Sequence, residues 1–220
     1  MNSLQAKYPL VIFDWDGTLM DSIGRIVSSV QNAAKSLDIP VPDVQAAKSI
    51  IGLSLPTAIA TLFHDVDESL HPELVKRYSH QYVELDTTPT PMFDYAEELL
   101  VNLKNAGCLL AVATGKSRAG LNRVFNSTGL EHLFDASICA DESQSKPHPA
   151  MLETLLKDLA VAKHQAVMVG DTGHDLQMAL NAGIDSIGVT CGVNDATTLS
   201  KLSPIAVADD MRALSSVLFR

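Results

Sequence analysis

Two aspartates, Asp14 and Asp16, follow an apolar run at residues 10–13 and are separated by one tryptophan. Two carboxylates held this close repel each other and both lose hydration, so the arrangement needs a compensating charge. A cation between them is the simplest remedy, and hard oxygen ligands favour Mg²⁺. Gly17 supplies the backbone freedom that a sharp exit from a strand requires. On its own the segment is equally compatible with an acidic turn, because Asp and Gly are ordinary turn residues.

Three further segments carry residue types that suit the same chemistry. Thr114 places a hydroxyl at the end of a second apolar run, and with Gly115 it precedes a helix, whose free N–H groups attract anions. Lys146 comes directly before a helix that begins with proline. Asp171 and Asp175 follow another apolar run with a spacing of four residues. Each segment also has a plain structural interpretation, as a helix cap, a solvated lysine or an acidic first helical turn.

Together these segments place acids, a hydroxyl and a lysine at the carboxyl ends of several predicted strands. Open α/β sheets bind their ligands at that edge. The set suits phosphoryl transfer, with a carboxylate nucleophile, Mg²⁺ held by acids, and hydroxyl and ammonium groups on the phosphoryl oxygens. A receiver-like signalling module or a silent phosphate-binding protein is the non-enzymatic alternative.

The elements that must position these residues alternate between strands and helices, which is typical of an α/β fold. Continuous apolar runs indicate strands buried on both faces of a parallel sheet, and they occur at 10–13, 109–113, 166–169, 187–189 and, more weakly, 205–208. Apolar positions at helical spacing cover 96–103, 121–125, 152–159 and 176–180.

The segment from about residue 21 to residue 86 breaks this alternation. Helical periods run through 23–37, 44–51, 55–63 and 72–85, and no convincing strand occurs among them. Residues 87–91, rich in threonine and proline, are typical of a linker back to the α/β pattern. An all-helical insert therefore follows the first predicted strand.

Composition excludes several classes of protein. The chain has 220 residues with a formal charge of −10, and 46% of them are hydrophobic, which is enough to bury a substantial core. The acidic balance disfavours a nucleic-acid or anionic-membrane partner, and no apolar stretch approaches the ~18–20 residues of a membrane span. Three scattered cysteines, Cys108, Cys139 and Cys191, indicate a reducing compartment. We therefore expect a cytoplasmic protein that contacts neither nucleic acid nor membrane.

The ordered motifs resemble the haloacid dehalogenase superfamily, in particular its phosphoglycolate phosphatase-like branch. The matching blocks are Asp14-Trp15-Asp16-Gly17-Thr18-Leu19, Thr114, Lys146-Pro147-His148-Pro149, and Gly170-Asp171-Thr172 with Asp175. They occur in the family's order and span most of the chain. The resemblance implies a Rossmann-like three-layer core with a parallel sheet at residues 1–19 and 91–220. It also implies an all-helical cap domain at residues 20–90, inserted after the first strand.

The resemblance also implies a role for each matching residue. Asp14 is the nucleophile that forms an aspartyl-phosphate, and Asp16 is the general acid and base. The groups expected to hold the phosphoryl group are Thr114, Gly115 and Lys146. The expected Mg²⁺ ligands are the Asp14 carboxylate, the Asp16 backbone carbonyl and Asp171, with Asp175 close by or acting through water.

The function expected from the resemblance is Mg²⁺-dependent hydrolysis of a small phosphorylated metabolite, such as phosphoglycolate or a sugar phosphate. A phosphosugar mutase or a pyrophosphatase of the same superfamily is the enzymatic alternative, since a mutase keeps the aspartate pair. Asp16 argues against a dehalogenase, which lacks an acid at that position. A phosphonatase would need a buried cap lysine, and the candidates Lys35, Lys48 and Lys76 are typical of helix surfaces. The sequence leaves the oligomeric state open.

Overall fold

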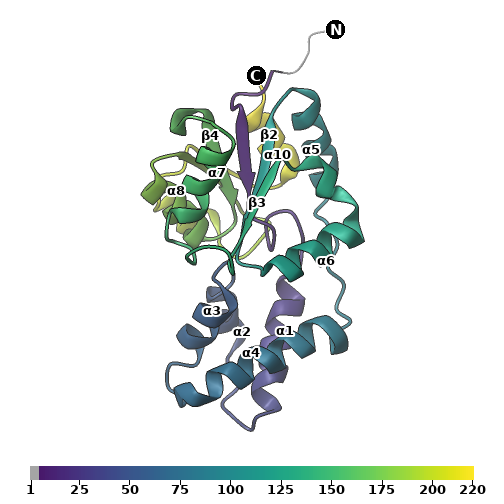
Figure 1. The fold of residues 1–220 in the computed structure, drawn as a ribbon, viewed down its shortest axis with the longest axis vertical. Helices are drawn as coiled ribbons and strands as arrows, with labels where there is room; N and C mark the ends of the chain where they lie inside the picture. Colours follow the sequence, from purple (N-terminus) through teal and green to yellow (C-terminus); the bar gives the residue numbers. More distant parts are fainter. Residues whose placement is uncertain (1–4) are drawn as a thin grey trace.

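The computed structural model describes residues 5–220, and a parallel sheet of six strands lies at its centre (Figure 1). The strand order is β3-β2-β1-β4-β5-β6, and every neighbouring pair is parallel. The strands are β1 Leu10–Phe13, β2 Leu109–Thr114, β3 Ala136–Cys139, β4 Ala166–Gly170, β5 Asp185–Val189 and β6 Ala206–Ala208. The order reverses between β1 and β4, which is the point where open α/β sheets bind ligands.

Helices cover both faces of the sheet and complete three layers. One face packs against α5 Ala96–Asn105, α6 Arg118–Thr128 and α10 Met211–Leu218. The other face packs against α7 Ala150–Asp158 and α8 Gly173–Ala182, and a short helix, α9 Ala196–Ser200, follows β5. The expected Rossmann-like α/β core is therefore present.

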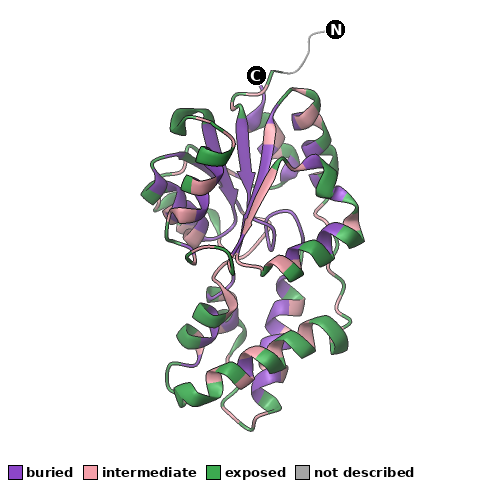
Figure 2. Ribbon diagram, viewed as in Figure 1, coloured by how far each residue is buried: buried purple, intermediate pink, exposed green. Residues whose placement is uncertain are grey.

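The central strand β1 shows why the sheet needs both helical layers. All four of its residues are fully buried, as Figure 2 shows for the inner strands generally. Val11 and Phe13 point into the core that contains α5, α6 and α10, whereas Leu10 and Ile12 point into the core that contains α7 and α8. Side chains alternate between the faces of a strand, so only a continuous apolar run fits this position.

Most of the predicted strands and helices are confirmed, and the exceptions have a physical reason. The strands predicted at 10–13, 109–113, 166–169 and 187–189 are present, and the weak run at 205–208 contains β6. Edge strand β3 was not predicted, because three of the four residues in Ala136–Cys139 are only partly buried and the segment lacks a continuous apolar signal. Helices α9 and α10 were also not predicted. The helix expected over 72–85 ends at His80 and continues as a π-helical turn, Gln81–Leu85.

Four helices between β1 and α5 form a separate group at one end of the molecule (Figure 1). They are α1 Ile23–Lys35, α2 Val44–Ser49, α3 Leu55–Leu62 and α4 His71–His80. Their buried faces make a hydrophobic cluster of their own, with Val30, Ile59 and Leu74 almost fully buried. The group lies beyond the carboxyl ends of the sheet strands, where the predicted site residues are.

The two segments that join this helical group to the sheet run side by side. A backbone bridge pairs Met20 with Met92, and the Asp21 amide donates to the Pro91 carbonyl at 2.8 Å. The chain therefore enters and leaves the helical group at almost the same place.

Asp86 ties the returning segment to helix α1. Its carboxylate accepts hydrogen bonds from the hydroxyls of Ser28 and Ser29 and, at 2.9 Å, from the Thr88 amide. Burial alone would raise the pKa of Asp86, but these hydrogen bonds outweigh burial and lower it to about 2. The ionised carboxylate is therefore the form that the folded protein stabilises.

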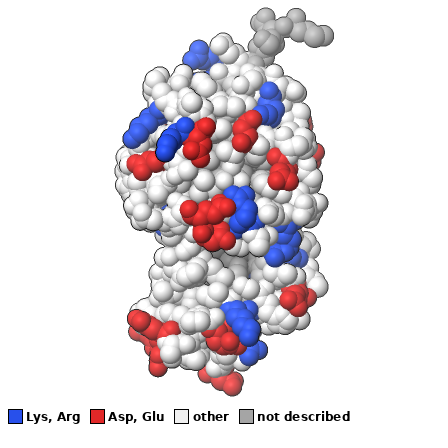
Figure 3. All heavy atoms as spheres, in the orientation of Figure 1, with Lys and Arg blue, Asp and Glu red and all other residues white. Residues whose placement is uncertain are grey.

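Acidic and basic side chains are interspersed over the face drawn in Figure 3. One ion pair joins Arg118 to Glu142 at 2.7 Å, and another joins Lys104 to Asp135 at 2.8 Å. Among the described residues, no helix has the length and apolar character needed to cross a membrane.

Replacing Asp86 with asparagine tests the contribution of this connection. We expect Asp86→Asn to lower the free energy of unfolding at pH 7 by about 1 kcal/mol, because charge-assisted hydrogen bonds are lost. The folded-state pKa lies below the ordinary value of 3.8, so this stabilisation is present above pH 4 and disappears as pH falls toward 2. Urea unfolding of both proteins from pH 7 down to pH 3 measures the difference. Asp65→Asn, at an exposed position, is the control. An equal loss of unfolding free energy in that variant would contradict a stabilising role of the Asp86 hydrogen bonds.

Candidate active site

The loop after β1 places Asp14 and Asp16 at the carboxyl edge of the sheet. The Asp14 amide donates to the Val169 carbonyl at 3.0 Å, which extends the pairing of β1 with β4 by one residue. Trp15 is fully buried and meets the Phe125 ring edge-on, with ring centroids 5.3 Å apart. Because Trp15 points into the hydrophobic core, the alternating side chains of Asp14 and Asp16 point away from it.

Asp14 is a buried carboxylate with unused bonding capacity. It is 1% exposed, and its Oδ1 lies 2.7 Å from the Lys146 ammonium. Its Oδ2 is buried and has no hydrogen-bond partner among the described residues. Burial raises the pKa of Asp14, and Lys146 opposes that rise. A buried carboxylate oxygen without a partner is costly, so this atom is suited to receive a ligand.

Lys146 lies between two carboxylates. Its side chain is fully buried, and its Nζ is 2.7 Å from Asp14 and 2.6 Å from Asp175. Burial alone would lower the pKa of Lys146, but the two carboxylates outweigh burial and raise it. Lys146 is therefore charged in the folded protein.

Asp171 and Asp175 come from the segment between β4 and α8. Asp171 accepts hydrogen bonds from the Thr18 hydroxyl at 2.9 Å and from the Val193 amide at 2.8 Å. Asp175 accepts from the Thr172 hydroxyl at 2.7 Å in a capping box at the start of α8, and its other oxygen contacts Lys146. Burial is the largest cause of the raised pKa of Asp171, followed by the charges of Asp175 and Asp14.

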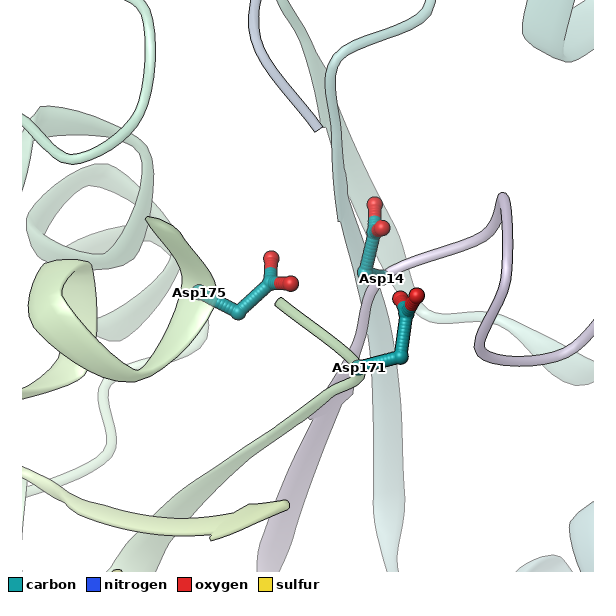
Figure 4. Close-up of side chains that lie close together, drawn as sticks. All are labelled: Asp14, Asp171 and Asp175. Carbon is teal, nitrogen blue, oxygen red and sulfur yellow. The ribbon is translucent and has the colours of Figure 1, made fainter. Parts of the chain in front are cut away.

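Three of these carboxylates form a group whose donor type suits a divalent cation. One oxygen each of Asp14, Asp171 and Asp175 lies within 4.8 Å of the others, and all three residues are buried (Figure 4). The Lys146 ammonium contacts two of these three acids, Asp14 and Asp175, and its single charge leaves excess negative charge when all three are ionised. Oxygen ligands with uncompensated charge fit Mg²⁺ well. The oxygens of Asp171 and Asp175 each already have a partner in the protein, whereas Asp14 has an oxygen with none, so Asp14 is the ligand most readily available to a cation.

Asp16 is not part of this carboxylate group. Its Oδ1 lies 2.9 Å from the Lys116 ammonium and accepts a hydrogen bond from the Ser22 hydroxyl at 2.5 Å. Lys116 also lies 5.2 Å from the centre of the Tyr82 ring. The charge of Asp16 raises the pKa of Lys116 despite its burial. The sequence assigned Lys116 no role, although it lies only two residues after Thr114.

Thr114 and Gly115 end β2 beside this pair. Thr114 is fully buried, and its hydroxyl accepts from the Lys116 amide at 3.2 Å. A Cβ on Gly115 would lie 2.6 Å from the carbonyl oxygens of both Gly52 and Leu53. Only glycine lets the backbone between α2 and α3 approach the sheet this closely.

Two further contacts join the backbone around the α2–α3 connection to the core. The Ser54 amide donates to the Ser145 hydroxyl at 2.9 Å, and the His174 ring bonds the Ser49 carbonyl at 3.1 Å. The Ser54 hydroxyl caps α3 through the Thr57 amide.

Several charged residues lie outside the site. Arg118 pairs with Glu142 and the β3 backbone, and Arg25 donates to the Thr88 carbonyl. Three lysines of the helical group were considered as Schiff-base residues, namely Lys35, Lys48 and Lys76. All three are exposed or half-buried, which does not fit the deprotonated amine that a phosphonatase needs.

A cavity of about 340 Å³ lies between the helical group and the core, and Asp14 and Asp16 line it. The remaining lining residues come from α1, the 50–55 segment, α3, α4, the π-helical turn, residues 115–117 and α6. A ligand in this cavity would lie against both parts of the molecule.

Comparison with known proteins shows the family to which this chain belongs. The family model for "Haloacid dehalogenase-like hydrolase" matches residues 11–189. The chain is 37% identical over 205 residues to "Probable phosphatase IndB" of Dickeya dadantii, covering 91% of this chain and 89% of that protein. It is 29% identical to "Phosphoglycolate phosphatase" of Vibrio cholerae, covering 95% and 96% of the two chains. A predicted phosphatase from Clostridium acetobutylicum has a solved structure that matches with a TM-score of 0.85 at 27% identity, covering 96% and 97%. This chain belongs to the haloacid dehalogenase-like hydrolases.

Proposed function

We propose that this hydrolase is a Mg²⁺-dependent phosphatase that cleaves a small phosphomonoester through an aspartyl-phosphate on Asp14. The observation that carries the proposal is the buried Asp14 carboxylate, which has an unpartnered oxygen next to the ammonium of Lys146. Relatives named as phosphatases, one of them 37% identical, support the same chemistry.

In the first step an Asp14 oxygen attacks phosphorus, and the bond from phosphorus to the leaving oxygen breaks. Asp16 donates its proton to that oxygen, so the alcohol leaves neutral. In the second step Asp16 takes a proton from water, whose oxygen attacks the same phosphorus. The bond from phosphorus to Asp14 breaks, which releases phosphate and restores both carboxyl groups.

The phosphoryl oxygens need positive and hydrogen-bonding partners while charge develops on them. Lys146 is the buried cation closest to Asp14, and it offsets repulsion between the nucleophile and a dianionic substrate. Thr114 and Gly115 would supply hydroxyl and backbone groups at the end of β2.

Mg²⁺ would be held by the Asp14 carboxylate, the Asp16 backbone carbonyl and Asp171, with Asp175 beside them. When bound, the ion stabilises negative charge on the phosphoryl group. The cluster of three buried carboxylates supports this assignment. Asp175 would also hold Lys146 through one oxygen, while its other oxygen accepts the Thr172 hydroxyl.

Residues 20–90 would act as a cap over a catalytic core made of 1–19 and 91–220. Such a cap excludes water from the aspartyl-phosphate site and contacts the leaving group. The close approach of Gly52 and Leu53 to Gly115 supports this role, since it brings the cap backbone to the end of β2.

Replacing Asp14 with asparagine tests the nucleophile. We expect Asp14→Asn to lower Mg²⁺-dependent phosphate release by at least about a thousandfold, because no covalent intermediate can form. Phosphate release from a panel of phosphomonoesters, with Mg²⁺ or with chelator, measures the loss, and circular dichroism controls for folding. Activity that survives in the variant would exclude Asp14 as the nucleophile. Transfer of the phosphoryl group to a second sugar hydroxyl without release would instead identify a mutase.

A side chain at position 115 should separate the cap backbone from the core. We expect Gly115→Ala to lower kcat/KM about tenfold, because its Cβ cannot lie 2.6 Å from two carbonyl oxygens. Hydrogen exchange of the Ser54 amide, which bonds Ser145, should become faster in this variant. Gly24→Ala is the control, since its Cβ would meet only Thr88 at 3.5 Å. Unchanged Ser54 exchange in Gly115→Ala would contradict this explanation.

A further inference from the structure

The cavity above Asp14 and Asp16 has mainly apolar walls. Its volume of about 340 Å³ falls within the range of small-molecule sites, roughly 300–1,000 Å³. A two-carbon leaving group such as glycolate would fill only a small part of it. The apolar and aromatic lining residues of the cap are Ile26, Val30, Ile50, Ile51, Leu53, Leu55, Ala58, Ile59, Tyr78, Tyr82 and Val83.

The cap side of the cavity contains no Lys, Arg or His among its described lining residues. The one hydroxyl there besides the tyrosines is Ser79, which donates to the Val75 carbonyl at 2.8 Å. On the core side, Lys116 is paired with Asp16, and Arg123 is exposed. A substrate carboxylate would therefore lose water without gaining a cation on the cap, and a row of sugar hydroxyls would find few side-chain partners there besides the tyrosine hydroxyls.

Two tyrosines form an aromatic surface on the wall of the cavity. Tyr78 and Tyr82 stack with ring centroids 5.8 Å apart and an interplanar angle of 27°. The cations of Lys116 and Arg25 lie 5.2 Å and 5.7 Å from the Tyr82 ring, which holds that ring in place. A flat apolar group can pack against such a surface.

The backbone that carries Tyr82 is itself unusual. Tyr82 and Val83 belong to the π-helical turn Gln81–Leu85, and both line the cavity. Isolated π-helical turns are rare and are frequent at functional sites. This turn brings the last part of the apolar wall over the catalytic carboxylates.

We propose that this site selects phosphomonoesters of primary alcohols that carry an apolar or aromatic group, in preference to phosphoglycolate and sugar phosphates. The inference rests on the proposed phosphatase function and names its substrate class. Water adds across the bond from phosphorus to the ester oxygen, which yields the apolar alcohol and inorganic phosphate. The apolar part of the alcohol occupies the cap side of the cavity throughout.

The test compares primary alkyl phosphates, because their leaving oxygens are chemically similar and the cavity then decides the difference. The set is ethyl phosphate, butyl phosphate, 2-phenylethyl phosphate, 2-phosphoglycolate and glucose 6-phosphate, each with Mg²⁺. We expect kcat/KM for 2-phenylethyl phosphate to exceed that for 2-phosphoglycolate and glucose 6-phosphate by about tenfold or more. The kcat/KM should also rise from ethyl phosphate to butyl phosphate to 2-phenylethyl phosphate. A preference for phosphoglycolate or glucose 6-phosphate would overturn the proposal.

A pair of variants on the π-helical turn links the preference to the cavity. Val83 and Leu85 are 43% and 54% exposed, so both positions can accept arginine without burying its charge, but only Val83 lines the cavity. We expect Val83→Arg to lower the ratio of kcat/KM for 2-phenylethyl phosphate to that for 2-phosphoglycolate about tenfold. The arginine adds a cation for the phosphoglycolate carboxylate and removes an apolar contact for the phenyl group. Leu85→Arg should leave this ratio within about twofold of its value in the unchanged protein. Equal shifts in the two variants would overturn the proposal.

4-Nitrophenyl phosphate separates failure of this inference from failure of the proposed function. If it is hydrolysed in an Asp14-dependent reaction while the apolar alkyl phosphates show no preference, the chemistry holds and the selectivity is wrong. If neither it nor any other ester is hydrolysed by the folded protein with Mg²⁺, both proposals are wrong.

Discussion

The ion pairs of the buried Lys146 ammonium are the interaction on which the carboxyl edge of the sheet depends. This ammonium contacts Asp14 at the end of β1 and Asp175 at the start of α8, so it joins two elements on either side of the point where the strand order reverses. Without a cation in this place, three buried carboxylates would face one another in a low-dielectric space. The ion pairs thus allow the acids to be close enough to act together.

The other parts of the fold serve to hold this arrangement in position. The fully apolar β1 fixes the start of the Asp14 loop, and the buried Trp15 fixes its direction. The amide of Val193, which follows β5, and the hydroxyl of Thr18 hold the Asp171 carboxylate from two sides. Because each partner comes from a different segment, the geometry of the site requires the segments after β1, β4 and β5 to be in place together.

Much of the core could be predicted because its signals are local. Continuous apolar runs marked the central strands, and the site residues Asp14, Lys146 and Asp171 each follow a strand or precede a helix, so their convergence follows from a parallel sheet. Edge strand β3 was not predicted because three of its four residues are only partly buried.

Contacts between the cap and the core could not be predicted, because they depend on packing between segments distant in sequence. The pairing of Lys116 with Asp16 and the contact of Gly115 with the 52–53 backbone have no local signature. The ion pair between Lys116 and Asp16 also places a charged group beside Tyr82 of the cap. The two parts of the molecule therefore share one electrostatic environment, although each has its own hydrophobic core.

The paired connection at Met20 and Met92 has a consequence for how such a protein can change over time. Since the chain leaves the sheet and returns at neighbouring positions, the intervening segment can vary in length and sequence while the strands keep their register. The residues at the carboxyl edge of the sheet and the helical group beside them are thereby encoded in separable stretches of the gene. An ancestral core could exchange one recognition module for another and retain its chemistry.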